Sequence, residues 1–170
     1  MVKLPPRSVD PERIRRIEVS TYQRAASKAR TAVTSSFGAK FSIPFAVATI
    51  LYHGRSGLES FSDAAVANPV IQRLAARVEV RENPAYTAAY PQEQRCDLVV
   101  TLVDGTALTG RCTMTKGEPD NPIREEELTR KFFELGTPVW GEALTQQLYD
   151  VFTRIEAVRD WRAIADRFLL

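Results

Sequence analysis

The elements that the sequence predicts are typical of an α+β fold, with a small antiparallel sheet, a buried central helix and further helices at the C-terminus. Three observations carry this prediction. Ile17, Val19 and Thr21 alternate with polar residues, as in a half-buried strand. The run from Phe41 to Tyr52 is apolar and of helical length, and 96–115 has the pattern of a β-hairpin.

The composition is that of an ordinary globular protein, long enough for one domain or one domain with an extension. Of the 170 residues, 44% are hydrophobic and 26% are charged, and 23 basic against 21 acidic residues give a net charge of +2. No basic block indicates nucleic acid. The longest apolar run is shorter than the about 20 residues that span a bilayer, and no signal pattern follows Met1. We therefore expect a cytoplasmic protein without a membrane segment.

The N-terminal part is predicted to be flexible over 1–9 and then to form a turn and a strand. Asp10 can cap a helical turn that has Pro11 at its first position. The strand follows directly. Residues 24–38 are small, polar and basic without a clear period, so we expect a long loop, of the kind that is often functional or mobile.

The stretch GAKFSIPFAVATILYHG, residues 38–54, is predicted to form the central helix. Ser42 can accept hydrogen bonds from the free N–H groups of the first turn, and Pro44 is tolerated there because it has no N–H group. From Phe45 to Tyr52 almost every residue is apolar or small, so the helix should have no solvent-exposed face. Residues 54–61 then turn the chain.

A second helix is predicted after this turn. Asn68 and Pro69 are a cap and a first helical residue, and apolar residues follow at helical spacing as far as Val78. A short strand should cover 78–81. The segment 82–94 is rich in proline and tyrosine and is predicted to be a loop.

The register of the hairpin follows from its apolar residues. Leu98, Val100 and Leu102 on the first strand lie on the same face as Leu108, Cys112 and Met114 on the second only if even-numbered residues pair with even-numbered residues. A three-residue loop at 103–105, with Gly105 in the left-handed region, gives this parity, whereas a two-residue turn does not. Cys96 would then face Cys112, and we expect two buried thiols there rather than a disulfide.

The C-terminal part is predicted to be helical. Residues 116–136 are a polar turn and an acidic helix start. A four-turn apolar stripe follows, made of Trp140, Leu144, Leu148, Val151, Phe152 and Ile155. Residues 160–170 are a short last helix. We therefore divide the chain into a flexible end at 1–9, an α+β domain at 10–122 and C-terminal helices at 123–170.

The chain contains few histidine and cysteine residues, the usual ligands of zinc and Fe–S clusters in proteins. His53 is the one histidine, and Cys96 and Cys112 are the two cysteines. That is too few for a cysteine-rich zinc site or an Fe–S cluster built from this chain alone. We predict no metal site, so any chemistry would use carboxylates, lysine, tyrosine or serine, or groups from another chain.

Three blocks, in their order and spacing, resemble the C-terminal part of the MmgE/PrpD family, which includes 2-methylcitrate dehydratases and cis-aconitate decarboxylases. They are AKFSIPFAVATILYHG at 39–54, the VVTLVDG hairpin at 99–105 and GEPDNPIREEELTRKF at 117–132. The resemblance covers almost the whole chain, from about residue 10. Members are longer and begin with a large helical domain. This chain is therefore similar to their smaller α+β domain, a lid over the cleft, with its return helices.

The resemblance implies a cofactor-free lyase or isomerase acting on hydroxy di- or tricarboxylates, as in propionate metabolism. Its reaction would begin by removing a proton next to a carboxylate, which needs a positioned base and cations or donors for the developing charge. Loss of water, loss of CO₂ or reprotonation on the other face would follow. Because the helical domain supplies most catalytic residues of the family, we expect no dehydratase activity from this chain alone. Whether the chain is an enzyme is left open.

The candidate substrate-binding residues lie first at the front of the central helix. Lys40 could meet a substrate carboxylate and Ser42 could donate to it, beside the positive end of the helix. In the alternative, Lys40 is solvated and Ser42 is only a cap. Phe45 stands where the family often has a tyrosine whose hydroxyl points into the active site, so no catalytic residue is assigned. It could equally be a core residue.

Lys131 is a third candidate for substrate binding, and His53 is a weak one. Lys131 matches the K-F of the third block, but it could simply pair with Glu127 one helical turn before it. His53 lies at the far end of the central helix, where a histidine is commonly a surface group that matches the helix dipole.

Two hypotheses for the function follow. In the first, the chain is the C-terminal domain of an MmgE/PrpD-type lyase or isomerase. A separately encoded helical domain or a homo-oligomer would then complete the site for a small carboxylate. In the second, the chain is a non-enzymatic binding or assembly module that uses an exposed C-terminal helical stripe. Neither hypothesis involves nucleic acid or a membrane.

Overall fold

The computed structural model describes residues 9–168, so most of the predicted flexible end at 1–9 lies outside the described residues. The chain divides into two compact units, Met1–Thr115 (unit 1) and Lys116–Leu170 (unit 2). An α+β fold with C-terminal helices is confirmed. The elements in order are η1 Pro11–Arg13, β1 Ile14–Thr21, α1 Gln23–Ala26, α2 Ser36–Ala39, α3 Ile43–His53, η2 Leu58–Phe61, α4 Asp63–Ala67, α5 Pro69–Ala76, β2 Val78–Glu82, α6 Pro84–Ala89, β3 Cys96–Leu102, β4 Ala107–Cys112, α7 Glu125–Phe152, η3 Ile155–Ala157 and α8 Trp161–Phe168.

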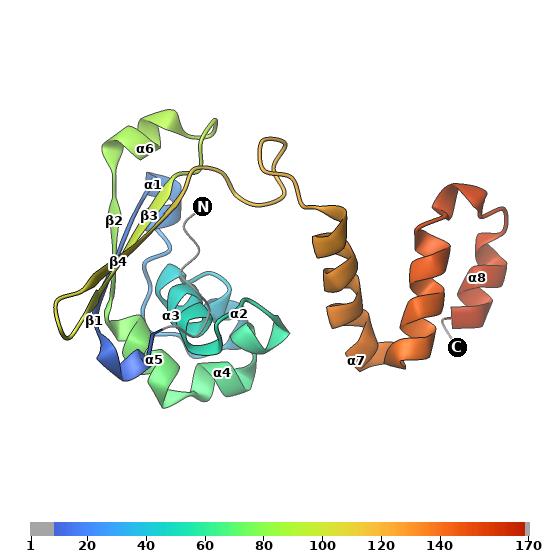
Figure 1. The fold of residues 1–170 in the computed structure, drawn as a ribbon, viewed down its shortest axis with the longest axis horizontal. Helices are drawn as coiled ribbons and strands as arrows, with labels where there is room; N and C mark the ends of the chain where they lie inside the picture. The colour runs from blue at the N-terminus through green and yellow to red at the C-terminus, as the bar shows by residue number, and fades with distance from the viewer. Residues whose placement is uncertain (1–8, 169–170) are drawn as a thin grey trace. The chain divides into compact units, whose positions relative to one another are not determined.

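The strands of unit 1 form one mixed sheet in the order β2-β1-β3-β4 (Figure 1). β3 is antiparallel to β1 and to β4, as predicted, but β2 is parallel to β1. The prediction of an antiparallel sheet is wrong for this pair. The helices α1 to α5 carry the chain back to the starting end of β1, so β2 runs in the same direction.

The register of the β3–β4 hairpin is the predicted one. Val100 pairs with Leu108 and Cys96 pairs with Cys112. Gly105 has φ 86°, and its N–H group donates to the Leu102 carbonyl at 3.1 Å. This confirms the three-residue loop, because a left-handed residue at its last position keeps equal parity across the ladder.

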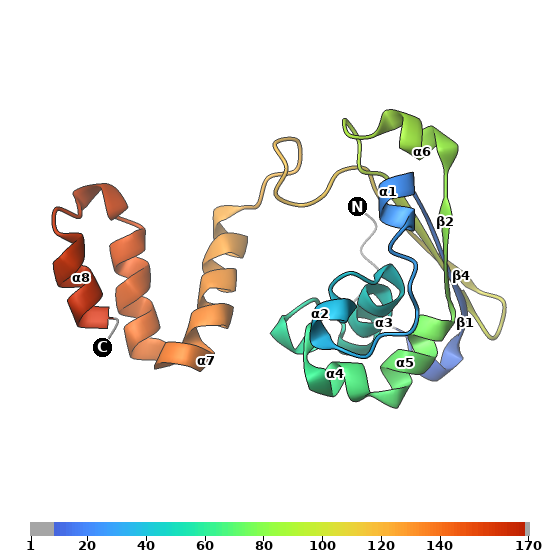
Figure 2. The same cartoon turned by 180° about the vertical axis from the view of Figure 1, so that it is seen from behind.

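One face of the sheet is covered by helices α2 to α5, and the core of unit 1 lies between these two layers (Figures 1 and 2). Its most buried large side chains come from both layers and include Ile17, Val19, Phe45, Ile71, Leu74 and Val100. The opposite face carries the polar residues that alternate with them along β1, as the period of two requires.

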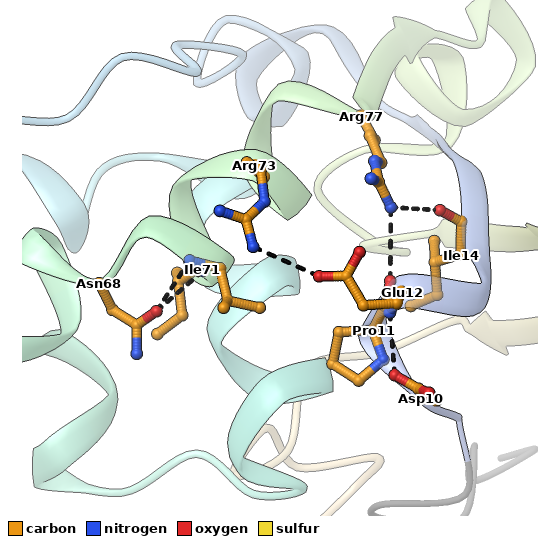
Figure 3. A network of polar contacts seen from close by, with 9 residues as sticks. Asp10, Pro11, Glu12, Ile14, Asn68, Ile71, Arg73 and Arg77 are labelled. Atoms are coloured by element: carbon orange, nitrogen blue, oxygen red, sulfur yellow. Dashed lines mark hydrogen bonds and ion pairs between the residues drawn. The ribbon is translucent and has the colours of Figure 1, made fainter.

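Polar contacts fasten η1 to α5 (Figure 3). Arg77 donates to the carbonyl of Ile14 at 2.5 Å, and Arg73 forms an ion pair with Glu12 at 3.3 Å. The side chain of Asn68 caps α5 by accepting from the Val70 N–H group at 2.9 Å, as predicted. These contacts fix the start of β1 against the helical layer.

Three predictions for the helices of unit 1 are wrong. α3 does have an exposed face, because Ile50 and Tyr52 are 41% and 38% exposed. The predicted loop at 24–38 contains most of α1 and the start of α2. The predicted loop at 82–94 contains α6, since Asn83 accepts from the Ala85 N–H group and so caps a helix that begins at Pro84.

Unit 2 is built around α7, which Gly141 breaks with φ 75°. The two halves of α7 turn back on each other and pack closely at Gly136. A Cβ atom added to this glycine would lie only 2.8 Å from the Thr145 side chain. The predicted continuous stripe is therefore wrong: the helix breaks inside it, and Trp140 and Phe152 are nearly half exposed while Leu148 is buried. Within residues 9–168, no helix combines the length and apolar character needed to cross a membrane.

Candidate functional site

Ser42 is the N-cap of α3, and its hydroxyl is committed inside the fold. Its Oγ accepts from the Phe45 N–H group at 3.1 Å and donates to the backbone carbonyl of Arg30. The residue is only 2% exposed. The cap is the one that the sequence predicts, whereas the bond to Arg30 joins the helix start to a loop twelve residues earlier.

The same helix start holds a second loop carbonyl. The Ile43 N–H group donates to the carbonyl of Lys28 at 2.9 Å. Lys28 and Arg30 are thus fixed through their backbones to the first turn of α3, next to Lys40, which ends α2. The backbones of three cationic residues therefore lie near the start of α3. The N–H groups of its first turn are already bonded to Ser42 and to the Lys28 carbonyl, so any attraction for an anion comes from the side-chain charges.

Two exposed aromatic rings accompany these cations. Phe37 and Phe41 are 73% and 52% exposed, and their ring centroids lie 5.1 Å apart. The Lys28 Nζ lies 5.6 Å from the centroid of the Phe41 ring, within reach of a cation–π interaction. We call the surface formed by Lys28, Arg30, Phe37, Lys40 and Phe41 the α3 edge.

The α3 edge lies in a part of the chain without acidic residues. Residues 19–58 contain five basic residues, which are Arg24, Lys28, Arg30, Lys40 and Arg55, and no aspartate or glutamate. No ion pair joins Lys40 to any residue of 9–168, and its side chain is exposed. From the sequence, Lys40 and Ser42 were named as candidates at this helix start, but Lys28 and Arg30 were not. The run without acidic residues is the signal that could have pointed to those two.

Phe45 lies in the core behind this edge. It is fully buried, and its ring centroid lies 6.4 Å from that of Phe61. A ring in this position supplies packing and has no proton to donate. The structure therefore places Phe45 among apolar residues, where a hydroxyl would need a hydrogen-bond partner.

His53 lies at the opposite end of α3, away from Ser42. Gly54 follows it in the left-handed conformation with φ 74° and ends the helix. The imidazole packs edge-on against Tyr52, and its Nε2 is buried without a hydrogen-bond partner among the described residues. His53 is the last of the eleven residues of α3, so the length of the helix separates it from the α3 edge and the structure does not bring the two candidates together.

Lys131 belongs to unit 2. It lines an apolar groove of about 580 Å³ on α7, together with Leu128, Phe132, Leu135 and Phe152. The alternative in which Lys131 pairs with Glu127 is not what the structure shows, because Glu127 binds Lys116 at 2.9 Å and Arg124 at 3.3 Å.

The backbone N–H of Arg124 and the side chains of Lys116 and Arg124 lower the pKa of Glu127 to about 2. The carboxylate is therefore ionised over most of the pH range and holds the first turn of α7.

The open face of the sheet is also charged, but its charges are paired. Arg111 makes two bonds to Asp97, at 2.9 and 3.0 Å, which lower the pKa of that carboxyl, and Tyr86 donates to Asp97 at 2.7 Å. Arg16 binds Glu79 at 2.5 Å. A shallow hollow of about 440 Å³ lies on this face. Since each of these cations already has a carboxylate, the open face is less suited to an anionic ligand than the α3 edge.

The cysteines are free thiols on facing strands. Burial raises the pKa of the Cys96 thiol to about 11, so it is protonated at neutral pH. Among residues 9–168, no three histidine, cysteine or acidic side chains gather as a metal site would require.

A small mixed sheet with one helical layer, a capped central helix whose front is cationic and a separate helical hairpin define the class, an α+β domain with a helical tail. The family profile of the MmgE/PrpD C-terminal domain matches residues 1–156. The chain belongs to the MmgE/PrpD family.

Two curated relatives match as well. They are the cis-aconitate decarboxylases of Homo sapiens, 24% identical over 130 residues, and of Mus musculus, 24% identical over 126 residues. Each alignment covers 74% of this chain and 26% of the relative. The chain therefore spans about a quarter of the length of the curated relatives it matches.

Proposed function

We propose that the chain is the C-terminal domain of a cofactor-free lyase or isomerase for hydroxy di- or tricarboxylates, and that its α3 edge holds a substrate carboxylate. The observation that carries this proposal is the gathering of Lys28, Arg30 and Lys40 at the start of α3 within a segment free of acids. Lys40 is exposed and forms no ion pair with any residue of 9–168, and we propose that its ammonium group meets the substrate. The family and the two decarboxylase relatives support the reaction class.

The chemistry would be proton removal from the carbon next to a carboxylate. A base takes the proton, and the electron pair of the broken C–H bond is delocalised toward the neighbouring carboxylate. Cations then stabilise the negative charge that develops on its oxygens. The α3 edge supplies such cations but no base, since Ser42 is committed to Phe45 and Arg30 and His53 lies at the other end of α3. We therefore propose that a helical domain outside these 170 residues supplies the base and that the 170-residue chain alone does not turn over substrate.

The test uses citrate and cis-aconitate as probes. In an NMR titration of the ¹⁵N-labelled chain, the amide signals of Lys28, Arg30 and Lys40 should shift with an affinity of ~1–10 mM, as for a few solvent-exposed charge contacts. Lys40→Ala should weaken this binding several-fold, and the control Arg130→Ala, which removes an exposed cation in unit 2, should leave it unchanged. Equal binding by Lys40→Ala would refute the assignment of the α3 edge.

The proposed inactivity is tested separately. The purified chain should release no product from 2-methylcitrate or cis-aconitate in an assay that detects a single turnover. Turnover by the chain alone, lost in Lys40→Ala, would show that it carries its own base and would overturn the need for a partner domain.

A second candidate function is assembly through unit 2, and the groove on α7 favours it. Leu128 in this groove is 58% exposed, and Phe132, Leu135 and Phe152 line the groove with it. A group of apolar side chains of this kind marks a binding surface. Leu128→Glu should abolish self-association measured by light scattering, whereas Val139→Glu, at a residue that is 71% exposed but outside the groove, should not. If the chain is monomeric and both variants behave alike, this function is refuted.

A further inference from the structure

The two cysteines lie directly opposite each other across the β3–β4 ladder, and no role has been given to them. Cys96 begins β3, Cys112 ends β4, and the register pairs the two residues. Directly paired residues of antiparallel strands have Cα atoms about 4.5–5.5 Å apart. A disulfide needs a Cα separation of about 4.4–6.8 Å, which this pairing meets. It also needs a Cβ separation of about 3.5–4.5 Å, so facing residues at about 4.5–5.5 Å must approach slightly at this end of the ladder.

Both thiols are free and half-buried, so a small reagent can reach them while the fold holds them in place. They lie on the same face, since residues of equal parity pair along this ladder. The Cys112 thiol donates to the carbonyl of Met114 at 3.0 Å, which is a weak bond and easily exchanged.

We propose that Cys96 and Cys112 are a reversible modification site, at which a low-molecular-weight disulfide such as oxidised glutathione converts the two thiols into a disulfide between β3 and β4. This proposal is independent of the proposed carboxylate chemistry. It uses the two cysteines of the sequence, neither of which belongs to the α3 edge.

The conversion takes two exchange steps. The Cys112 thiolate attacks one sulfur of the glutathione disulfide, whose S–S bond breaks and releases one glutathione thiolate. The Cys96 thiolate then attacks the Cys112 sulfur of the mixed disulfide and releases the second glutathione. The two protons lost by the cysteines are taken up by the two glutathione thiolates, so the protein is oxidised and glutathione is reduced by two electrons.

The order of attack follows from burial. The raised pKa of the Cys96 thiol leaves little thiolate at neutral pH, so Cys112 reacts first with the reagent. Cys96 reacts second because the facing sulfur is held beside it, and such proximity compensates for a low thiolate fraction.

The disulfide would act on the edge of the sheet. β4 is an edge strand that pairs only with β3 in this sheet, and Cys112 is its last residue. A covalent bond there fastens the free end of β4, from which the chain continues to unit 2 at Lys116. Oxidation should therefore slow opening of the end of β4, which edge strands otherwise undergo readily.

The experiment treats the 170-residue chain with oxidised glutathione and then alkylates the remaining thiols for mass spectrometry. The wild-type chain should become lighter by two hydrogens, carry no alkyl group and yield one cross-linked peptide pair. Excess reduced glutathione should reverse the change. Hydrogen exchange at the amides of 107–112 should be slower in the oxidised form.

Matched variants separate this outcome from ordinary glutathionylation. Cys96→Ser should keep one glutathione on Cys112, and Cys112→Ser should react much more slowly. The proposal is overturned if the wild-type chain retains glutathione, cross-links to a second copy or keeps both thiols under conditions in which Cys96→Ser has reacted fully. The first two of these outcomes are read from the wild-type chain alone, so they do not depend on the folding of either variant.

Discussion

Replacing Ser42 by alanine should destabilise unit 1 by about 2 kcal/mol without changing the charge of the α3 edge. Loss of a serine N-cap costs about 1 kcal/mol, since the Phe45 N–H group loses its acceptor. Loss of the bond to the Arg30 carbonyl costs about 1 kcal/mol more, because that bond is partly buried. In a unit of this size the two losses lower the midpoint of thermal unfolding by ~10 °C.

The measurement is urea denaturation followed by circular dichroism, with the slope of the transition unchanged. Ser42→Gly separates the two losses, since glycine at an N-cap costs only a few tenths of a kcal/mol while the Arg30 bond is still lost. Ser35→Ala is the matched control, because its hydroxyl makes one exposed cap contact to the Gly38 N–H group at 3.1 Å. A cost for Ser42→Ala below about 0.5 kcal/mol, less than one cap, would show that the hydroxyl is not structural.

Two further changes test the interior of unit 1 and the start of α7. Phe45→Tyr should destabilise the protein by about 1–3 kcal/mol in the same urea assay, because its hydroxyl enters a fully buried site; an unchanged midpoint would mean that the ring edge reaches water or a polar partner. Glu127, whose pKa is lowered to about 2, should stabilise unit 2 fully above pH 4.5, its ordinary pKa, and progressively less as the pH falls to about 2. Glu127→Gln should remove this acid-dependent loss of helix, as measured by circular dichroism; an identical acid transition in that variant would contradict it.

Local chemistry explains most of what the sequence predicted correctly. Asp10, Ser42 and Asn68 cap their helices because a short polar side chain can reach the N–H groups two or three residues later. The β3–β4 register could be predicted because parity alone decides which residues share a face. Asn83 and Pro84 carry the same cap signal as Asn68 and Pro69, so α6 was predictable, but the proline and tyrosine content of the segment favoured a loop.

Long-range pairing explains most of what the sequence did not show. Nothing in the pattern of β2 says whether it joins β1 or β3, or in which direction, because that depends on the path of the helices between them. The spacing of the apolar residues also did not reveal the break of α7 at Gly141. An isolated glycine is tolerated in a helix, so Gly141 alone does not predict the break, but Pro138 lies three residues before it and was a signal that the apolar period overrode.

The front of α3 separates two roles that its sequence motif combines. Ser42 and Phe45 are used inside the fold, one to hold the helix start and the Arg30 loop and the other to fill the core. Under the proposed function, the groups left to meet an anion are the side chains of Lys28, Arg30 and Lys40, all three of which are exposed. Under the proposed function, a phenylalanine at position 45 would leave the site without an acid or donor there but would keep its attraction for carboxylates. If binding by Lys40 is found without turnover, the missing base must come from outside this chain.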